Sequence, residues 1–406
     1  MEKLPAALES AEPLMQCNII EEFDIPKANH EMGRRLQEYL DRGGKYLRPA
    51  IVLSAMKACG KAGVESGVWL ARSLQYDHNF FLIHDDMEDG SLFRRGRPTM
   101  HILYGNDFAI NYGDYLRSIA EMAMDRGSNM VGPGVQRNLI LARHEMLKTT
   151  AEGQDLEFAL RSQPLSKTTE SKVLAILESK SAFYTIWTPF RYGALASHVQ
   201  PRKIDELKPA LINIGLAFQI RDDVLDMLAA KTEETGEATL ESQKFGKDWL
   251  GDLEEIKRTI PLCRTIERLE SGDRIDRTYL YKMLDTGGIM RNLVSQRNEM
   301  RMEAVASIAY GDNCKDGGIE ERIACVKSKL LDMMQNAEYR ELQERIDHAK
   351  LTVLDIMNKY NALEDSQDTA TKLYEDNIGT VKEALPDSEA RKELLELLQY
   401  AVMRKF

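Results

Sequence analysis

The chain has 406 residues, 43% of them hydrophobic, with 54 lysines and arginines against 65 aspartates and glutamates and a formal net charge of -11. Such a chain can bury a full core in one large domain or two ordinary ones. Its acidic balance and the lack of a long basic cluster argue against a nucleic-acid partner. An anionic ligand must therefore be held by a few placed cations or by metal.

The cysteines are odd in number, widely scattered and without a C-x-x-C pair, which predicts reduced thiols with packing roles in a cytosolic protein. They are Cys17, Cys59, Cys263, Cys314 and Cys325. The N-terminal segment has no basic region followed by an apolar core, and no window is long and apolar enough to span a membrane. We expect a cytoplasmic protein with no membrane span.

Helix-forming residues recur at helical spacing almost throughout, and no succession of alternating β-branched runs appears, so the sequence predicts an all-α fold. Glycine and proline mark the joints. Gly43 and Gly44 precede a helix that should begin near Arg48. Further breaks are expected at 60–67, 96–105, 127–134, 162–166, 198–201 and 231–246.

The first candidate site is the segment 78–89, in which an apolar helical run ends in D-D-x-x-D at Asp85, Asp86 and Asp89. At helical spacing Asp85 and Asp89 share one face, with Asp86 beside them. Three carboxylates so close repel one another unless a cation joins them. Oxygen ligands of this kind suit Mg²⁺ that shares its remaining positions with substrate phosphates. A single such motif also fits a solvated acidic helix end.

A second D-D-x-x-D, at Asp222, Asp223 and Asp226, follows the apolar run LINIGLAF. Two facing helices could hold metal between them, as helical bundles do in their cores. Magnesium that bridges a diphosphate makes it a good leaving group, because the metal neutralises the charge that the group gains. The pair of motifs therefore favours a metal site over two unrelated acidic helix ends.

Basic residues flank both motifs. They are Lys45 and Arg48 upstream, Arg94 and Arg95 after the first motif, and Lys247 and Lys257 after the second. Taken singly, each is more often a solvated surface charge. Diphosphate recognition, however, needs arginine and lysine donors from several directions in addition to metal. The sequence has no G-x-S-x-G elbow, complete P-loop or H-E-x-x-H that would indicate another chemistry.

The character of the sequence changes after about Gly272. Residues 284–350 are rich in arginine, glutamate, aspartate and methionine, contain the loop GDNCKDGG, and otherwise predict amphipathic helices with broad polar faces. A more apolar pattern returns from about Leu351. We interpret 284–350 as a helical insertion within a single domain covering 1–406, peripheral to the chemistry.

The motifs resemble those of the trans-isoprenyl diphosphate synthases, the polyprenyl synthetase family that includes farnesyl and geranylgeranyl diphosphate synthases. They occur in family order as GGKYLRP, HNFFLIHDDMEDGSLFRRGRPT, KSAFYTIWTP, FQIRDDVLD and GKDWLGDLEEIKRTIP. The resemblance covers roughly residues 40–262, with a weaker match from Leu351 onward. It implies the isoprenoid synthase fold, a large helical bundle around a deep central cavity, usually as a homodimer.

Carried over by position, the resemblance implies a Mg²⁺-dependent prenyltransferase that joins isopentenyl diphosphate to an allylic diphosphate, with about three ions bound beside substrate and Mn²⁺ as a substitute. The isopentenyl diphosphate residues would be Gly44, Lys45, Arg48, His78 and Arg95. The metal ligands would be Asp85, Asp89 and Asp222, followed by Asp86 and Asp226, and Asp223 completes the second motif. The allylic diphosphate would contact Arg94, Lys180, Lys247 and Lys257, and the allylic cation would face the oxygens of Ser181 and Gln219.

Three positions depart from the family pattern. Ser181 stands where threonine is usual, which preserves the hydroxyl. Ile256 stands where many members have glycine before Lys257. The stretch from Lys247 to Asp252 is a residue longer than in some members, and this changes the direction in which the Lys247 side chain would point.

Product length is predicted from Phe80 and Phe81, which precede Asp85 by five and four residues on one helix. At about 1.5 Å per residue they lie roughly 6 to 7.5 Å below the metal-binding end, along the path of a growing tail. Phe81 shares the face of Asp85, whereas Phe80 is rotated away. In the family, aromatic residues at these offsets resemble the short-product arrangement. We therefore expect farnesyl diphosphate, with geranylgeranyl diphosphate second.

Two other readings stay open. A class I terpene cyclase also carries a D-D-x-x-D helix but ordinarily replaces the second motif, and it needs no counterpart of Lys45, Arg48 and His78. A non-catalytic regulatory subunit of a synthase could lose its aspartates, yet all six are present here. Both readings are less compatible with the sequence than a synthase.

Overall fold

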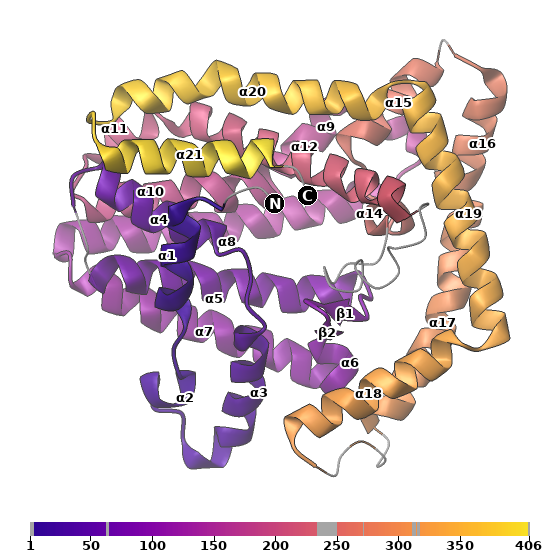
Figure 1. Cartoon of the computed structure of the whole chain (residues 1–406), viewed down its shortest axis with the longest axis horizontal. Helices are drawn as coiled ribbons and strands as arrows, with labels where there is room; N and C mark the ends of the chain where they lie inside the picture. Colours follow the sequence, from indigo (N-terminus) through magenta and orange to yellow (C-terminus); the bar gives the residue numbers. More distant parts are fainter. Residues whose placement is uncertain are drawn as a thin grey trace.

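The computed structural model describes residues 4–61, 65–233, 250–270, 272–310, 314 and 317–404. These residues are almost entirely helical (Figure 1), which confirms the predicted all-α class. Their only strands are β1 (Phe93–Arg94) and β2 (Arg97–Pro98), which pair antiparallel. None of the helices in the described ranges is long and apolar enough to cross a membrane.

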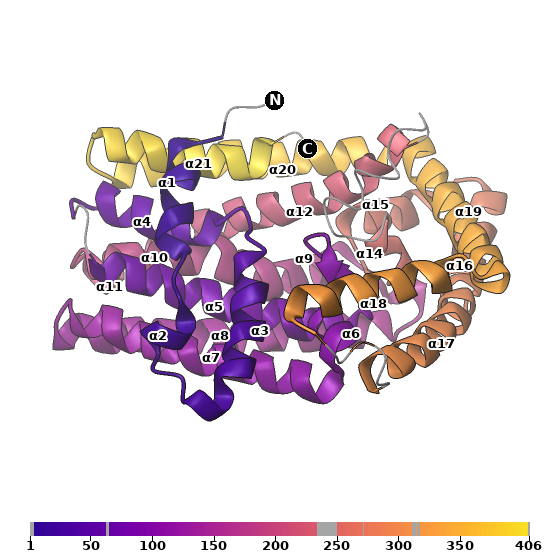
Figure 2. The same ribbon diagram turned by 60° about the horizontal axis from the view of Figure 1, so that its bottom comes forward.

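Long helices form the main bundle and run roughly along its length (Figures 1 and 2). They are α4 (Leu47–Ala58), α5 (Glu65–Glu88), α7 (Asn106–Asn129), α8 (Pro133–Arg161), α10 (Thr188–Ala196), α12 (Lys208–Glu233), α20 (Ala362–Ala384) and α21 (Glu389–Met403). Their apolar faces meet in one core, in which Leu74, Trp187, Ile214 and Leu398 are fully buried. Burial of this kind is the main source of stability for such a bundle.

Shorter elements connect or cover these helices. Those between the long helices are α6 (Met100–Tyr104), η2 (Leu165–Lys167), α9 (Glu170–Leu177), α11 (Pro201–Asp205), α14 (Gly251–Glu254) and α15 (Ile260–Leu269). The N-terminal segment α1 (Ala6–Met15), α2 (Ile19–Glu22), η1 (Lys27–Asn29) and α3 (His30–Asp41) crosses the face of the bundle in Figure 1. Leu36 and Tyr39 of α3 are fully buried in a second apolar cluster with residues of α5 and α7.

Between α9 and α10 the chain forms a stretch of π-helix, η3 (Glu178–Trp187). Its wide turns end at Thr188-Pro189, where proline supplies no backbone donor. The backbone N–H and the hydroxyl of Thr188 both donate to the carbonyl of Phe183, five residues back. Such local π turns are rare and are frequent at functional sites.

The helices between α15 and α20 stand across one end of the bundle (Figure 2), and we call them the arm. It comprises α16 (Arg274–Leu284), α17 (Ile289–Tyr310), α18 (Ile319–Met334) and α19 (Ala337–Lys359). The predicted insertion, 284–350, begins where α16 ends and finishes within α19. Ile323, Val326 and Leu330 of α18 are buried in one cluster with Leu103 of α6. The arm therefore packs on α6, the helix that follows the β1–β2 hairpin.

The structure also corrects the prediction that all five cysteines are reduced. Cys314 and Cys325 form a disulfide, with their Cα atoms 5.8 Å apart. Cys314 is buried in the same apolar cluster as Leu103, and its partner Cys325 lies on α18. Sequence spacing cannot show that proximity. The remaining three cysteines are free thiols.

Candidate active site

The first aspartate motif lies at the C-terminal end of α5. The backbone N–H of Asp89 donates to the carbonyl of Asp85 at 2.9 Å, so helical geometry continues to the last aspartate of the motif. Gly90, with φ +64°, then ends the helix, in a conformation that glycine adopts without strain. The partial negative charge of a helix C-terminus adds to that of the carboxylates and favours a cation at this end.

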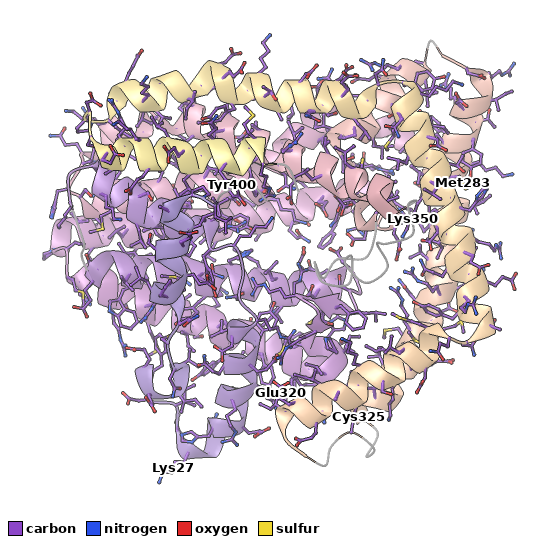
Figure 3. The ribbon with its side chains drawn as sticks, in the orientation of Figure 1. Lys27, Met283, Glu320, Cys325, Lys350 and Tyr400 are labelled. Atoms are coloured by element: carbon purple, nitrogen blue, oxygen red, sulfur yellow. A yellow bond between two sulfur atoms is a disulfide. The ribbon has the colours of Figure 1, made fainter. Side chains whose placement is uncertain are left out.

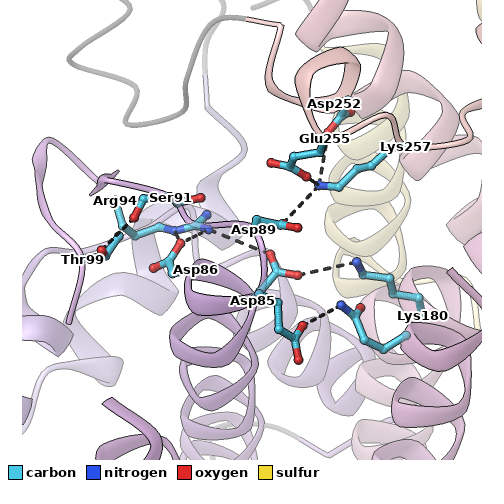
Figure 4. Close-up of polar contacts among 12 residues, drawn as sticks. Asp85, Asp86, Asp89, Ser91, Arg94, Thr99, Lys180, Asp252, Glu255 and Lys257 are labelled. Carbon is cyan, nitrogen blue, oxygen red and sulfur yellow. Dashed lines mark hydrogen bonds and ion pairs between the residues drawn. The ribbon is translucent and has the colours of Figure 1, made fainter. Parts of the chain in front are cut away.

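Cations from four separate elements surround this motif, and Figure 4 shows Arg94, Lys180 and Lys257 among them. The Nζ of Lys180 lies 3.5 Å from the Asp85 carboxylate. The Asp89 carboxylate contacts Arg161 of α8 at 3.3 Å and Lys257 at 3.5 Å. The fourth cation, Arg94 of β1, lies 4.0 Å from Asp85. Three elements distant in the sequence and the β1–β2 hairpin therefore bring positive charge to one helix end.

Asp86 differs from its two neighbours because it is fully buried and paired with Arg94. The guanidinium donates through Nε at 2.8 Å and also through its second terminal nitrogen. Burial raises the pKa of Asp86 to about 6, although the charge of Arg94 opposes the rise. This pair ties the end of α5 to the β1–β2 hairpin.

Lys180 reaches the site because α8 and α12 approach η3 very closely. A Cβ on Gly153 of α8 would lie 2.3 Å from the backbone nitrogen of Lys180, and one on Gly215 of α12 would lie 2.7 Å from the Cβ of Ala182. Only glycine fits at either position. The ammonium of Lys180 also donates to Glu157 of α8 at 3.0 Å. Burial favours a neutral lysine, but the Asp85 and Glu157 carboxylates outweigh it and raise the pKa of Lys180.

Lys257 follows α14 in a tight turn. The N–H of Ile256 donates to the carbonyl of Leu253 at 3.1 Å, and the N–H of Lys257 donates to the carbonyl of Asp252 at 2.8 Å. This is a Schellman motif, which requires a left-handed residue at the position of Ile256. Ile256 indeed has φ +56°. The departure from the family's glycine thus places a β-branched residue in a conformation that it rarely adopts.

The side chain of Lys257 lies among carboxylates. Its Nζ is 2.6 Å from Glu255, 3.3 Å from Asp252 and 3.5 Å from Asp89. Burial alone would lower the pKa of Lys257, but these carboxylates, Glu255 first, hold it well above the usual range. Lys247, the other lysine predicted here, lies outside the described residues.

The second motif lies on α12. The Asp222 carboxylate accepts a hydrogen bond from the guanidinium of Arg404. The side chain of Arg221 in turn holds the backbone of Arg404, because its guanidinium donates to the Arg404 carbonyl at 3.2 Å. Gln219 donates to Asp223 at 2.8 Å and accepts from the hydroxyl of Ser181.

The hydroxyl of Ser181 and the amide of Gln219 therefore join η3 to α12. Asp226 lies one turn further along α12. Among the residues that the structure describes, no three aspartate, glutamate, histidine or cysteine side chains converge closely enough to hold a metal ion.

The residues predicted to bind isopentenyl diphosphate fall into two groups. Arg48 contacts the Nε2 of His78 at 3.3 Å, donates to the hydroxyl of Thr185 at 2.8 Å, and lies 4.2 Å from the ring centre of Tyr184. Burial, and then the charge of Arg48, hold the pKa of His78 well below its usual value. A neutral imidazole can therefore accept or donate a hydrogen bond here.

The other group is nearer the surface. Gly44 and Lys45 are exposed at the start of α4. A Cβ on Gly44 would lie 3.1 Å from the guanidinium of Arg95, so these two residues are in contact. Arg95, with φ +54°, occupies the tight turn between β1 and β2 together with Gly96.

The Phe80 and Phe81 rings lie 4.9 Å apart, and each ring also packs against a different neighbouring element. The Phe81 ring packs against Tyr184 of η3, with centroids 5.5 Å apart. The Phe80 ring packs against His84 at 4.8 Å and lies 5.9 Å from the Arg117 guanidinium of α7. Phe81 thus faces η3, and Phe80 faces α7.

Sequence reasoning missed Glu157, Arg161 and Tyr184. The segment KSAFYTIWTP includes Tyr184, but its letters do not show that its ring contacts Arg48, His78 and Phe81. Glu157 and Arg161 form an i,i+4 pair on α8, with 3.5 Å between their charged atoms. Such pairs are common on exposed helix faces, so the spacing alone does not indicate a site.

Comparisons with known proteins give a family and a fold. The sequence model of the polyprenyl synthetase family matches residues 29–293, more than half of the chain. A short chain isoprenyl diphosphate synthase of Methanothermobacter thermautotrophicus is 31% identical over 242 residues, 59% of this chain and 69% of the relative. A geranylgeranyl diphosphate synthase of Methanosarcina mazei is 32% identical over 252 residues, 60% of this chain and 70% of the relative.

A farnesyl diphosphate synthase of Geobacillus stearothermophilus is 30% identical over 55% of this chain and 71% of its own length. Among solved structures, the fold resembles a geranylgeranyl pyrophosphate synthase from Corynebacterium glutamicum complexed with isoprenyl diphosphate and magnesium. The TM-score is 0.70, the identity is 21%, and the match covers 99% of this chain and all of the other. That likeness supports the fold.

Proposed function

The chain belongs to the polyprenyl synthetase family and is a prenyltransferase, and from this premise we propose that it joins isopentenyl diphosphate to allylic diphosphates to give all-trans farnesyl diphosphate. Geranylgeranyl diphosphate is the next candidate product. One observation carries the proposal: Lys180 and Lys257, from elements far apart in the sequence, both face the carboxylates of the first motif. Acidic and basic groups arranged in this way suit a diphosphate held through metal.

We propose Mg²⁺ as the metal, with Mn²⁺ able to replace it and about three ions bound beside substrate. The donors fit, because they are hard carboxylate oxygens, and the side chains of Asp85 and Asp222 are 28% and 35% exposed. Asp85, Asp89 and Asp222 would hold the ions, which neutralise charge on the leaving diphosphate. Asp86, Asp223 and Asp226 would support these ligands.

The protein's own groups would divide between the two substrates. Lys180, Lys257, Lys247 and Arg94 would bind the allylic diphosphate and stabilise it as it leaves. The hydrogen-bonded oxygens of Ser181 and Gln219 would face the allylic cation.

The other substrate, isopentenyl diphosphate, would bind at Arg48, His78, Lys45, Arg95 and Gly44. Its double bond attacks the cation and a proton is then lost, for which the released diphosphate is the proposed acceptor. No protein nucleophile is needed.

The floor of the proposed product channel consists of Phe80 and Phe81. The Phe81 ring packs against Tyr184, and Tyr184 in turn contacts Arg48. The Phe81 ring therefore lies near the position proposed for isopentenyl diphosphate. Replacing the two rings with alanine would remove bulk from the path of the growing tail.

An assay of product length tests the proposal. Wild-type protein is incubated with Mg²⁺, isopentenyl diphosphate and dimethylallyl, geranyl or farnesyl diphosphate in turn, and the products are separated by chain length. We expect fifteen-carbon product from the wild type and chains of about twenty carbons or more from Phe80→Ala with Phe81→Ala. Cyclised hydrocarbon would support a terpene cyclase, and no product would support a regulatory subunit. An unchanged distribution in the double variant would exclude these rings as the floor.

We further propose a homodimer and a cytoplasmic location. Several exposed apolar side chains lie on α7 and α8, the helices along the lower edge of the bundle in Figure 2. They are Phe108, Ile110, Met122, Leu141, Leu156 and Phe158. Such residues favour a covered surface, and a second copy of the chain would cover it.

A further inference from the structure

A single buried carboxylate links the arm to the end of α14. Glu254, the last residue of α14, contacts three cations, Arg297 and Arg301 of α17 and Lys350 of α19. Lys350 lies 2.7 Å from the carboxylate, Arg297 donates a hydrogen bond to it, and Arg301 is 3.9 Å away. Lys350 lies on the side of α19 that faces the bundle (Figure 3). Glu254, Arg297 and Lys350 are all buried.

Each cation of this cluster has a second partner that fixes its direction. Arg297 donates to Gln343 at 2.8 Å, Arg301 donates to the Tyr339 hydroxyl at 2.9 Å, and Lys350 lies 3.5 Å from Asp347. These partners all belong to α19. The cluster thus joins α17, α19 and α14 at one buried point, with the geometry of a fixed attachment.

Three residues after Glu254 comes Lys257, at the end of a turn that local sequence does not favour. Helix α14 has only four residues, and its C-terminal turn contains the left-handed Ile256. A conformation of this kind persists only when surrounding structure imposes it. Buried apolar contacts of Ile256 supply part of that restraint, and the fixed carboxylate of Glu254 supplies a directional part.

We propose that Glu254, Arg297 and Lys350 are positioning residues through which the arm holds the last turn of α14 and aims Lys257 at Asp89 and the allylic diphosphate. The inference rests on the proposed function, because it gives the arm a role in binding one of the two substrates. Arg48 and His78, on α4 and α5, are outside this linkage. Substitutions in the cluster should therefore weaken the binding of allylic diphosphate and leave the binding of isopentenyl diphosphate unchanged.

The test compares Lys350→Met with Lys350→Arg. Methionine keeps the apolar stem and removes the charge, whereas arginine restores a donor to Glu254. For Lys350→Met we expect kcat/KM for the allylic substrate to fall on the order of tenfold, as a small misplacement of a binding group can cause. The KM for isopentenyl diphosphate should stay at the wild-type value, and Lys350→Arg should recover most of the loss.

Two controls separate positioning from general damage to the arm. Lys359→Met makes the same substitution on α19, where the partner is Asp276 of α16 at 2.6 Å, and it should leave the kinetics unchanged. Leu330→Ala removes a fully buried side chain of α18 that is not part of the cluster. It should lower the melting temperature without the selective loss for allylic substrate.

The outcomes distinguish this inference from the proposed function. Absence of product from the wild-type protein would overturn the proposed function itself. If the wild type is active and Lys350→Met keeps normal allylic kinetics, or loses affinity for both substrates equally, the positioning role is wrong. A loss in Leu330→Ala with the same selectivity would also overturn it.

Discussion

The left-handed conformation of Ile256 can be tested by comparing two substitutions, Ile256→Ala and Ile256→Gly. The native residue has φ +56° and a side chain that is 3% exposed. Both variants remove the buried side chain beyond Cβ, so both should be less stable than the wild type, by about 2 to 5 kcal/mol. A glycine that matches the family pattern therefore does not stabilise this protein.

The difference in stability between the two variants reports mainly on the backbone conformation at position 256. Alanine keeps a Cβ in the left-handed region, at a cost of about 1 to 2 kcal/mol. Glycine is free of that cost but loses about 0.5 to 1 kcal/mol more backbone entropy on folding. The glycine variant should therefore be the more stable of the two, by up to about 1.5 kcal/mol.

Urea unfolding followed by circular dichroism measures this difference. The matched control is Leu253, which is 1% exposed and lies within α14. There the order should reverse, because in a helix glycine is about 1 kcal/mol less favourable than alanine. If Ile256→Ala equals or exceeds Ile256→Gly in stability, the strained turn beside Lys257 is not a feature of the folded protein.

Three further predictions concern binding and pH. Arg161→Met should lower kcat/KM for allylic diphosphate by roughly tenfold, because Asp89 loses one of its two cations; equal rates in wild type and variant would exclude Arg161 from the site. Arg48→Ala should chiefly raise the KM for isopentenyl diphosphate, and a larger change for the allylic substrate would mean that the two sites are reversed. Burial lowers the pKa of His101 from 6.5 to about 4. As the pH is lowered, the unfolded chain therefore binds a proton at His101 before the folded protein does. The free energy of unfolding should decrease by roughly 3 kcal/mol between pH 6.5 and pH 4. In His101→Gln that part of the loss should disappear, as urea unfolding at several pH values would measure.

The sequence was sufficient for the fold class and for the elements that carry the two aspartate motifs. Helical periodicity and chain breakers predicted the start of α4 and the breaks after α4 and α8, because these signals are local. The resemblance also named Lys180 and Lys257, which the structure brings to the first motif.

Features that depend on packing between distant elements were not predictable in the same way. The contact of Arg161 with Asp89 depends on the approach of α8 to α5, and the Glu254 cluster depends on the arm folding across the end of the bundle. The disulfide between Cys314 and Cys325 likewise depends on where packing places Cys314 against α18. A left-handed isoleucine runs against local preference, so sequence reasoning could note the departure at Ile256 but not its conformation.

The central claim is that two aspartate motifs act together, through metal, on one allylic diphosphate. Its most direct test is the rate of condensation by Asp222→Ala, measured with isopentenyl and geranyl diphosphates at saturating Mg²⁺ beside Asp85→Ala and wild type treated with chelator. The account predicts that each variant loses about a hundredfold or more in turnover, and that chelated wild type regains activity when Mg²⁺ is restored. A folded Asp222→Ala protein with near-normal turnover, or wild-type activity that survives chelation, would contradict it.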